Sequence, residues 1–96
     1  MNYLAVDLGA ESGRVMIGTL HDDKLTLRQA HRFANGPIEE NGSLKWDFRT
    51  LMSEIKAGLK IAIEQCRGDV AGIGVDSWGV DFGLLDKDGI LLENPY

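Results

Sequence analysis

The stretch VDLGAESGRV (residues 6–15) places a tight turn between two apolar runs. Residues 3–6 are apolar without alternation, which predicts a short buried strand. A second strand is predicted at 14–20 and a third at 24–33, where the apolar alternation fails at Ala30. Because antiparallel neighbours can be joined by such short turns, these three strands are predicted to form a meander.

A long helix is predicted after a loop at residues 34–45, which contain the turn formers Asn-Gly-Pro and Asn-Gly-Ser. Asp47 is a good N-cap, and Gly68 supplies the C-terminal stop. One face of the helix is apolar at helical spacing: Phe48, Leu51, Met52, Ile55, Leu59, Ala62, Ile63 and Cys66. Gly58 inside the helix costs about 1 kcal/mol relative to alanine, which a close packing contact would explain.

The chain after the helix contains a glycine-spaced apolar run at 70–76, which predicts a fourth strand parallel to the first. Residues 81–86 and 89–92 are then predicted to form a hairpin with its turn at 86–89. A meander, one helix and one parallel strand make part of an α/β layer. Helix is too scarce to cover both faces of the sheet, so one face is expected to be open.

Composition excludes several classes of protein. The 96 residues suffice for one domain or a piece of one, and the net charge of −5 argues against nucleic acid or anionic membranes as partners. No apolar run approaches the ~20 residues of a membrane helix, and the N-terminus lacks the regions of a signal peptide. Cys66 is the single cysteine, so no intrachain disulfide can form and a cytoplasmic location is expected.

Two predicted parallel strands end in aspartate, Asp7 and Asp76, which would lie at the edge of the sheet where α/β folds bind ligands. A carboxylate there can hold Mg²⁺ through water, while the N–H groups of Gly9 to Arg14 point at phosphate oxygens. Ser12 can add a hydroxyl and Arg14 a guanidinium. Glu11 is expected to point outward, because its carboxylate would repel a triphosphate.

The same residues also fit an ordinary tight hairpin, in which Asp7 is a turn former and Arg14 is solvated. The residue types alone leave both interpretations open. The turn is not a Walker A motif, because it contains no Gly-Lys-Ser/Thr.

The segment DSWGVD (residues 76–81) combines carboxylates, an aromatic ring and a glycine at a strand end. Carboxylates accept hydroxyl hydrogen bonds, Trp78 offers an apolar face, and Gly79 allows close approach to the backbone, so the segment suits a sugar. Taken alone, the segment is more simply explained as a turn with a half-buried tryptophan and two solvated aspartates. Trp46 directly precedes the N-cap Asp47, and packing of an apolar side chain at that position explains its presence.

The segment DLGAESGR (residues 7–14) resembles the first phosphate motif of the FGGY-family carbohydrate kinases, with Ala10 where the family usually has threonine. HRFANG (31–36), Trp46-Asp47 and GVDSWGVDF (74–82) are most similar to the branch of that family that acts on L-rhamnulose. The resemblance runs through essentially the whole chain, with its motifs in the same order.

The resemblance implies an α/β fold, part of a ribonuclease H-like domain of the actin/Hsp70/hexokinase type. It also implies ATP-dependent phosphorylation of L-rhamnulose to L-rhamnulose 1-phosphate with Mg²⁺. Asp7 would lie near the metal. The residues expected at the ATP phosphates are Ala10, Glu11, Ser12, Gly13 and Arg14. Gly79 is expected to contact the sugar, and Trp78 and Asp81 to line its pocket.

Members of the family are much longer and close two domains over their substrates. Residues 1–96 are therefore expected to form the N-terminal part of the first domain, with no catalytic base among them and no kinase activity alone. The resemblance leaves open a kinase for xylulose, fuculose or glycerol. A non-catalytic phosphate- or nucleotide-binding module is the alternative of a different class. No prediction of oligomeric state follows.

Overall fold

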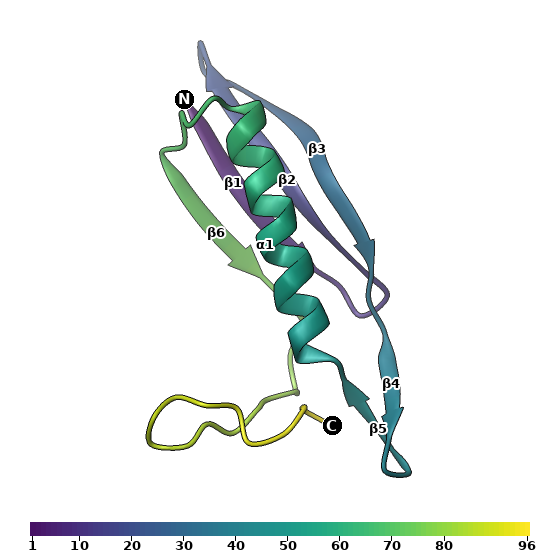
Figure 1. Ribbon diagram of the computed structural model, residues 1–96. Helices are drawn as coiled ribbons and strands as arrows, with labels where there is room; N and C mark the ends of the chain where they lie inside the picture. Colours follow the sequence, from purple (N-terminus) through teal and green to yellow (C-terminus); the bar gives the residue numbers. More distant parts are fainter.

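The computed structural model describes residues 1–96, all of the chain (Figure 1). Its elements are β1 (Asn2–Leu8), β2 (Ser12–His21), β3 (Lys24–Ala34), β4 (Pro37–Glu40), β5 (Ser43–Trp46), α1 (Phe48–Gln65) and β6 (Gly72–Asp76). None of its helices has the length and apolar character needed to cross a membrane.

The main sheet has four strands in the order β3-β2-β1-β6. β1, β2 and β3 pair antiparallel, and β6 pairs parallel with β1 after the chain has passed through α1. This confirms the predicted meander, helix and parallel strand, the arrangement expected for part of a ribonuclease H-like domain. β6 begins at Gly72, two residues later than predicted.

A bulge interrupts the pairing of β3 with β2, because Val15 pairs with His31 whereas Met16 pairs with Gln29. The extra residue is Ala30, where the sequence alternation fails. Since side chains alternate across a strand, one extra residue moves the odd-numbered side chains to the other face. Leu27 therefore lies on one face of the sheet and Phe33 on the opposite one.

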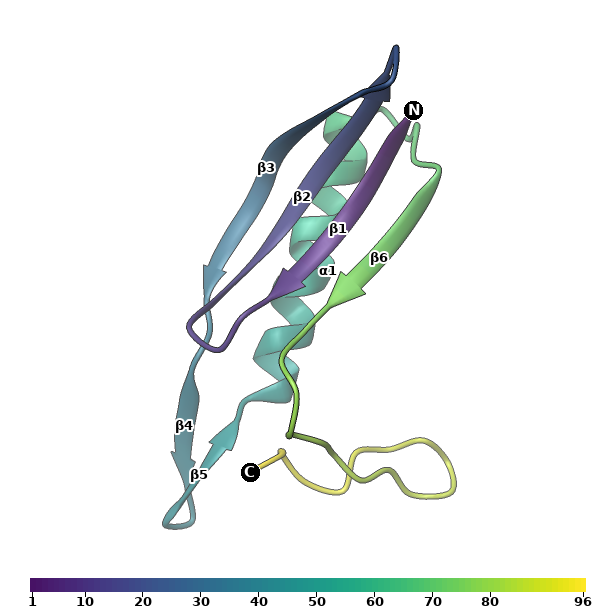
Figure 2. The same cartoon turned by 180° about the vertical axis from the view of Figure 1, so that it is seen from behind.

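The core lies between one face of the sheet and α1, as Figures 1 and 2 show from opposite sides. Its buried members are Leu4, Val6, Leu8, Val15, Ile17, Phe33, Ala62 and Cys66. The opposite face has no helix over it, as predicted (Figure 2). We call it the open face.

Gly58 of α1 is buried at the place where the helix crosses β2 and β3. A Cβ atom at this position would stand 2.5 Å from Cγ2 of Val15 and 3.1 Å from Cδ2 of His31. The first distance is shorter than real Cβ contacts and the second is tighter than most of them, so only glycine allows this approach without a shift of its neighbours. The packing contact expected from the sequence is therefore present.

Both ends of α1 match the predicted signals. The Asp47 side chain accepts hydrogen bonds from the Thr50 backbone N–H, at 3.3 Å, and from the Thr50 hydroxyl, at 2.7 Å. At the other end Gly68 has φ +77°, and its N–H donates to the Ile63 carbonyl at 3.0 Å.

Of two predictions about the irregular segments, one was wrong and the other is confirmed only in part. Residues 34–45 are not a plain loop, because β4 and β5 form an antiparallel hairpin that turns at Asn41-Gly42. Both turn residues have positive φ, 50° and 78°, as an Asn-Gly turn of this type requires. The hairpin predicted at 81–92 turns at 86–89 as expected, with Leu85 bridged antiparallel to Leu91 and the Leu92 N–H donating to the Leu84 carbonyl at 2.9 Å, but it has no regular strands beyond this bridge.

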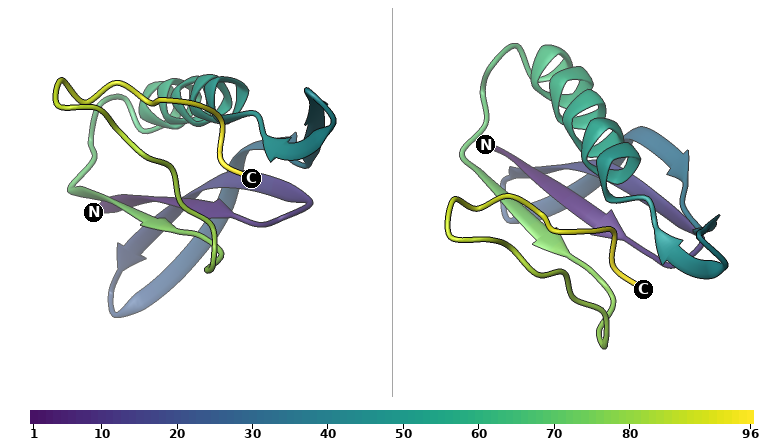
Figure 3. Two further views of the ribbon diagram at one scale, coloured as in Figure 1. Left: turned by 90° about the horizontal axis from the view of Figure 1, so that it is seen from below. Right: turned by 60° about the horizontal axis from the view of Figure 1, so that its bottom comes forward.

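The last residues return to the hairpin and to the start of α1, which the two views of Figure 3 place beside them. The backbone N–H of Trp46 donates to the Pro95 carbonyl at 2.7 Å, and the backbone N–H of Phe48 donates to Oδ1 of Asn94 at 3.3 Å. This docking closes residues 77–92 into a large loop beyond the end of β6.

Lys45 of β5 fixes the same segment by its charge. Its buried ammonium lies 3.3 Å from the Glu93 carboxylate, 3.7 Å from that of Glu40 and 4.7 Å from the centre of the Tyr96 ring. Burial alone lowers the pKa of Lys45, but the hydrogen bond and charge of Glu93, with the charges of Tyr96 and Glu40, outweigh it. The pKa of Lys45 is therefore above its ordinary value.

Candidate functional site

A row of four charged residues crosses the main sheet where β1 ends. Strand pairing sets Asp76 beside Asp7, Asp7 beside Arg14, and Arg14 beside Arg32. Asp7 lies between the buried Val6 and Leu8, so its side chain points to the open face. Its register partners share that face. Two carboxylates therefore adjoin two guanidinium groups on the open face, and the sequence prediction that Asp7 and Asp76 share one edge is confirmed.

The inner pair of this row is in contact. Nε of Arg14 lies 3.4 Å from Oδ2 of Asp7, and their side chains are 44% and 47% exposed. Arg32 makes no ion pair, and it lines a shallow hollow of about 350 Å³ together with Glu11 and Ser12. Nothing in the sequence around Arg32 predicts its place in the row, because that place depends on the bulge at Ala30.

The carboxylate pair fits Mg²⁺ of the kind that a nucleotide brings with it. Mg²⁺ keeps several waters and uses one or two protein carboxylates together with substrate phosphates. Asp7 and Asp76 offer that number of carboxylates, and the chain contains no group of three or more His, Cys, Asp or Glu side chains that could cage a metal. Asp7 and Asp76 would hold such an ion, which would supply positive charge to a bound phosphate.

The turn between β1 and β2 exposes part of its backbone. The Gly9 N–H donates to the Ser12 carbonyl at 2.9 Å, so the expectation that every N–H group from Gly9 to Arg14 faces a ligand was too broad. The N–H groups of Ala10 and Glu11 meet no protein acceptor, and both residues are exposed. The turn thus has two free donors at its tip.

Gly13, the last glycine of the turn motif, has a packing role in the structure. It is buried in β2, and a Cβ atom there would overlap the ring of Phe33. The absence of a side chain at Gly13 lets Phe33 of β3 lie against β2 and fill the core directly beside the turn.

Asn35 was not expected at this site, yet it holds the turn from the side. It follows the last residue of β3, and its Nδ2 donates to the Gly9 carbonyl at 2.8 Å. Its backbone N–H donates to the Glu11 carbonyl at 2.9 Å. Asn35 and Gly9 are 26 positions apart in the sequence, and only the pairing of β2 with β3 brings them together.

The predicted sugar residues cluster just beyond β6. Nε1 of Trp78 donates to Oδ2 of Asp81 at 2.5 Å, and Nε1 of Trp46 donates to the same oxygen at 3.1 Å. The two indole rings lie 4.6 Å apart between centroids at 44°. Trp46 therefore contacts Trp78 and Asp81, which its sequence position before α1 did not indicate. Gly79 has nothing within 4 Å of the position of a Cβ, so its surroundings are open.

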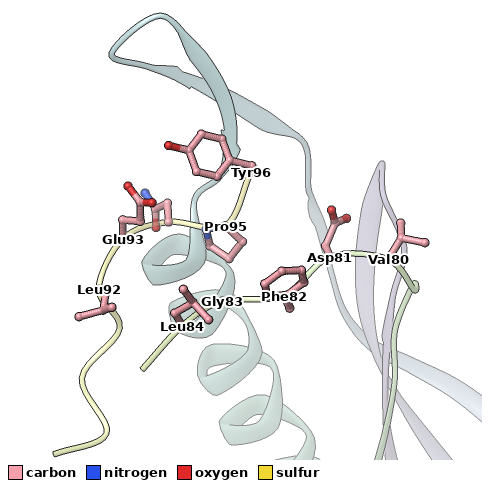
Figure 4. Close-up of a pocket in the computed structure, with 10 residues that line it drawn as sticks. Val80, Asp81, Phe82, Gly83, Leu84, Leu92, Glu93, Pro95 and Tyr96 are labelled. Atoms are coloured by element: carbon pink, nitrogen blue, oxygen red, sulfur yellow. The ribbon is translucent and has the colours of Figure 1, made fainter. Parts of the chain in front are cut away.

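Asp81 borders two hollows. One, of about 410 Å³, is mostly apolar and is bordered by Leu8, Ile55, Val75 and Trp78. The other, of about 300 Å³, lies between residues 80–84 and 92–96, and Figure 4 shows Asp81 and Glu93 at opposite sides of it. The turn and the Asp81 cluster are thus at the same end of the sheet, since Leu8, just before the turn, borders the first hollow.

Known proteins resemble this chain along nearly its whole length. No model of a protein family matches the chain. A rhamnulokinase of Bacteroides thetaiotaomicron is 48% identical over 96 residues, and a rhamnulokinase of Ligilactobacillus salivarius is 44% identical over 93 residues. The chain is therefore similar in sequence to these two proteins. The alignments cover 99% and 97% of it, and it spans about a fifth (19%) of the length of each of these curated relatives.

Proposed function

We propose that this chain forms part of an ATP-dependent kinase that converts L-rhamnulose to L-rhamnulose 1-phosphate. The observation that supports this most directly is the row of two carboxylates and two guanidinium groups beside a turn with free N–H donors. Homology to rhamnulokinases at 44–48% identity supports the substrate. Residues 1–96 would be the N-terminal part of the first domain, with the catalytic base supplied from elsewhere in a longer protein.

On the phosphate side, the proposal uses groups that the turn already presents. The free N–H groups of Ala10 and Glu11 donate to phosphate oxygens, and Ser12 adds its hydroxyl. Phosphoryl transfer gains most from positioning and from neutralising charge on the phosphoryl oxygens. Arg14 supplies a guanidinium for that purpose, and Asp7 restrains it through their ion pair. The exposed Glu11 carboxylate must then point away from the phosphates.

On the sugar side, one oxygen of Asp81 is used by two indole N–H groups, whereas Oδ1 has no protein partner and can accept from a sugar hydroxyl. Trp78 offers its ring to the apolar face of the sugar, and the open space at Gly79 admits the ligand to the backbone. These groups bind and orient the sugar, and none of them is assigned the role of base.

The test is a coupled assay of ADP release by the full-length protein that contains this chain. L-rhamnulose is compared with xylulose, fuculose and glycerol, and we expect the highest kcat/KM for L-rhamnulose. A higher value for another of these substrates would replace the substrate but keep the kinase. Binding of ATP without ADP release on any of them would identify a non-catalytic nucleotide-binding module instead.

A substitution then tests the sugar site. Asp81→Asn keeps the size of the side chain and removes its charge, so we expect the KM for L-rhamnulose to rise while the KM for ATP stays unchanged. The matched control is Asp23→Asn in the β2–β3 turn, at the other end of the sheet, which should change neither constant. Equal kinetics for both variants would remove Asp81 from the sugar site.

A further inference from the structure

We propose that Asn35 is a positioning residue for the nucleotide: it orients the turn between β1 and β2 so that the N–H of Ala10 faces the phosphates. The inference rests on the proposed function, because it concerns the same turn. It adds a residue from β3's end that touches neither substrate and acts through the backbone of the turn.

The first step is the hydrogen-bond pattern of the turn. In an antiparallel pair, residues 9 and 12 would exchange two backbone hydrogen bonds. Only one is present: the Gly9 N–H donates to the Ser12 carbonyl at 2.9 Å, and no bond returns from the Ser12 N–H to the Gly9 carbonyl. The Gly9 carbonyl instead accepts from Nδ2 of Asn35 at 2.8 Å. Asn35 has therefore taken the place of the second backbone bond.

The second step follows from the planarity of the peptide group. The peptide between Gly9 and Ala10 is trans, so its C=O and N–H point in opposite directions. A Gly9 carbonyl that is drawn toward Asn35 turns the Ala10 N–H away from Asn35. That N–H has no protein acceptor, and Ala10 is exposed. The hydrogen bond from Asn35 thus determines the direction in which one free donor of the turn points.

The third step is that Asn35 holds both ends of the turn. Its side chain binds the Gly9 carbonyl, and its backbone N–H binds the Glu11 carbonyl at 2.9 Å. Asn35 is itself fixed, because the preceding Ala34 pairs with Ser12 in the sheet and Phe33 is buried against Gly13. The donor therefore comes from a rigid part of the structure. Preorganised donors bind a ligand without first having to order.

The experiment uses Asn35→Ala in the full-length protein. Loss of one hydrogen bond to a part-buried carbonyl should raise the KM for ATP, and the dissociation constant for ADP measured by calorimetry, about tenfold. The KM for L-rhamnulose should not change. The control is Asn2→Ala, the same substitution at the other end of the sheet, where the side chain also loses one hydrogen bond, to the Thr19 hydroxyl at 2.7 Å. This control should change neither nucleotide constant.

A second variant, Asn35→Leu, keeps the size of the side chain and adds no charge, and it should give the same selective loss of nucleotide affinity. Unchanged nucleotide constants, or an equal rise of both KM values, would overturn the inference. Failure of both variants to fold would overturn it as well, since Asn35 would then stabilise the fold and not the direction of the turn. An inactive wild-type protein that binds no nucleotide would instead contradict the proposed function.

Discussion

The residues that follow the bulge in β3 determine the surroundings of the β1–β2 turn. Arg32 joins the charged row on the open face, Phe33 packs on Gly13, and Asn35 binds the two carbonyls of the turn. His31, on the helix side, lies beside Gly58 and 3.0 Å from the Glu54 carboxylate. A short stretch of one strand thus supports the turn from several directions.

Gly58→Ala tests how closely α1 approaches the sheet. Alanine favours a helix by about 1 kcal/mol over glycine, but its Cβ would stand 2.5 Å from Val15. The cost of the clash should exceed the gain in helix propensity, because overpacking a core costs about 1–3 kcal/mol. We expect a lower thermal midpoint, measured by circular dichroism. Ser53→Ala on the exposed side of α1 is the control and should not lower it.

Trp46→Phe tests whether Trp46 restrains Asp81. The substitution keeps an aromatic ring against Trp78 and removes the N–H that donates to Asp81 at 3.1 Å. We expect the KM for L-rhamnulose to rise by a factor of about five, because one hydrogen bond to a charged but exposed group is lost. The KM for ATP should not change. A change in both constants would mean that Trp46 acts only on stability.

At the scale of elements, the β4–β5 hairpin is the support for the loop that follows β6. It carries Trp46, and its buried Lys45 holds the Glu93 carboxylate at 3.3 Å. Asn94 joins the same contact by donating to the Glu40 carboxylate at 3.0 Å. The positions of Asp81 and its neighbours thus depend on a hairpin that lies outside the main sheet.

The raised pKa of Lys45 predicts how this contact responds to pH. A pKa above the ordinary value means that the ammonium form stabilises the folded state. That contribution is complete below the unfolded pKa of about 10.4 and is lost as pH rises through the higher folded pKa. Lys45→Met should lower the thermal midpoint at pH 8, and the difference from wild type should shrink as the pH rises through the folded pKa. A constant difference would exclude ionisation of Lys45 as the cause.

The sheet order and the helix could be predicted because apolar runs and helical spacing are local signals. The β4–β5 hairpin was missed because its strands have four residues each, too few for a clear alternation. Its Asn41-Gly42 turn is visible in the sequence, but Asn-Gly also occurs in irregular loops. Asn35 and Trp46 were missed for another reason: their partners lie 26 and 35 positions away, so only the folded chain brings them together.

At the scale of the whole molecule, α1 leaves much apolar surface uncovered. Val75 of β6 is 67% exposed although its register partner Val6 is in the core, and Phe82 is 76% exposed. Uncovered apolar side chains beside an unpaired strand edge favour association.

We expect residues 1–96, when produced alone, to elute from a size-exclusion column with an apparent mass greater than that of the monomer. They should also bind an apolar dye. Val75→Lys places a charge on the β6 edge and should reduce both effects, because edge charges oppose strand pairing. Glu64→Lys on the exposed side of α1 adds the same residue away from that edge and should not. A monomeric wild-type chain that binds no dye would contradict this expectation.

The parallel pairing of Asp7 with Asp76 also has a consequence for the order in which the chain assembles. β1 and β2 are adjacent in sequence and can pair as soon as both have been synthesised, whereas β6 must wait for β3, the hairpin and α1. Contacts between distant segments form later because their loop closure costs more entropy. We therefore expect the ion pair between Asp7 and Arg14 to form before β6 pairs with β1. Asp76 is then placed beside a carboxylate whose charge is already balanced.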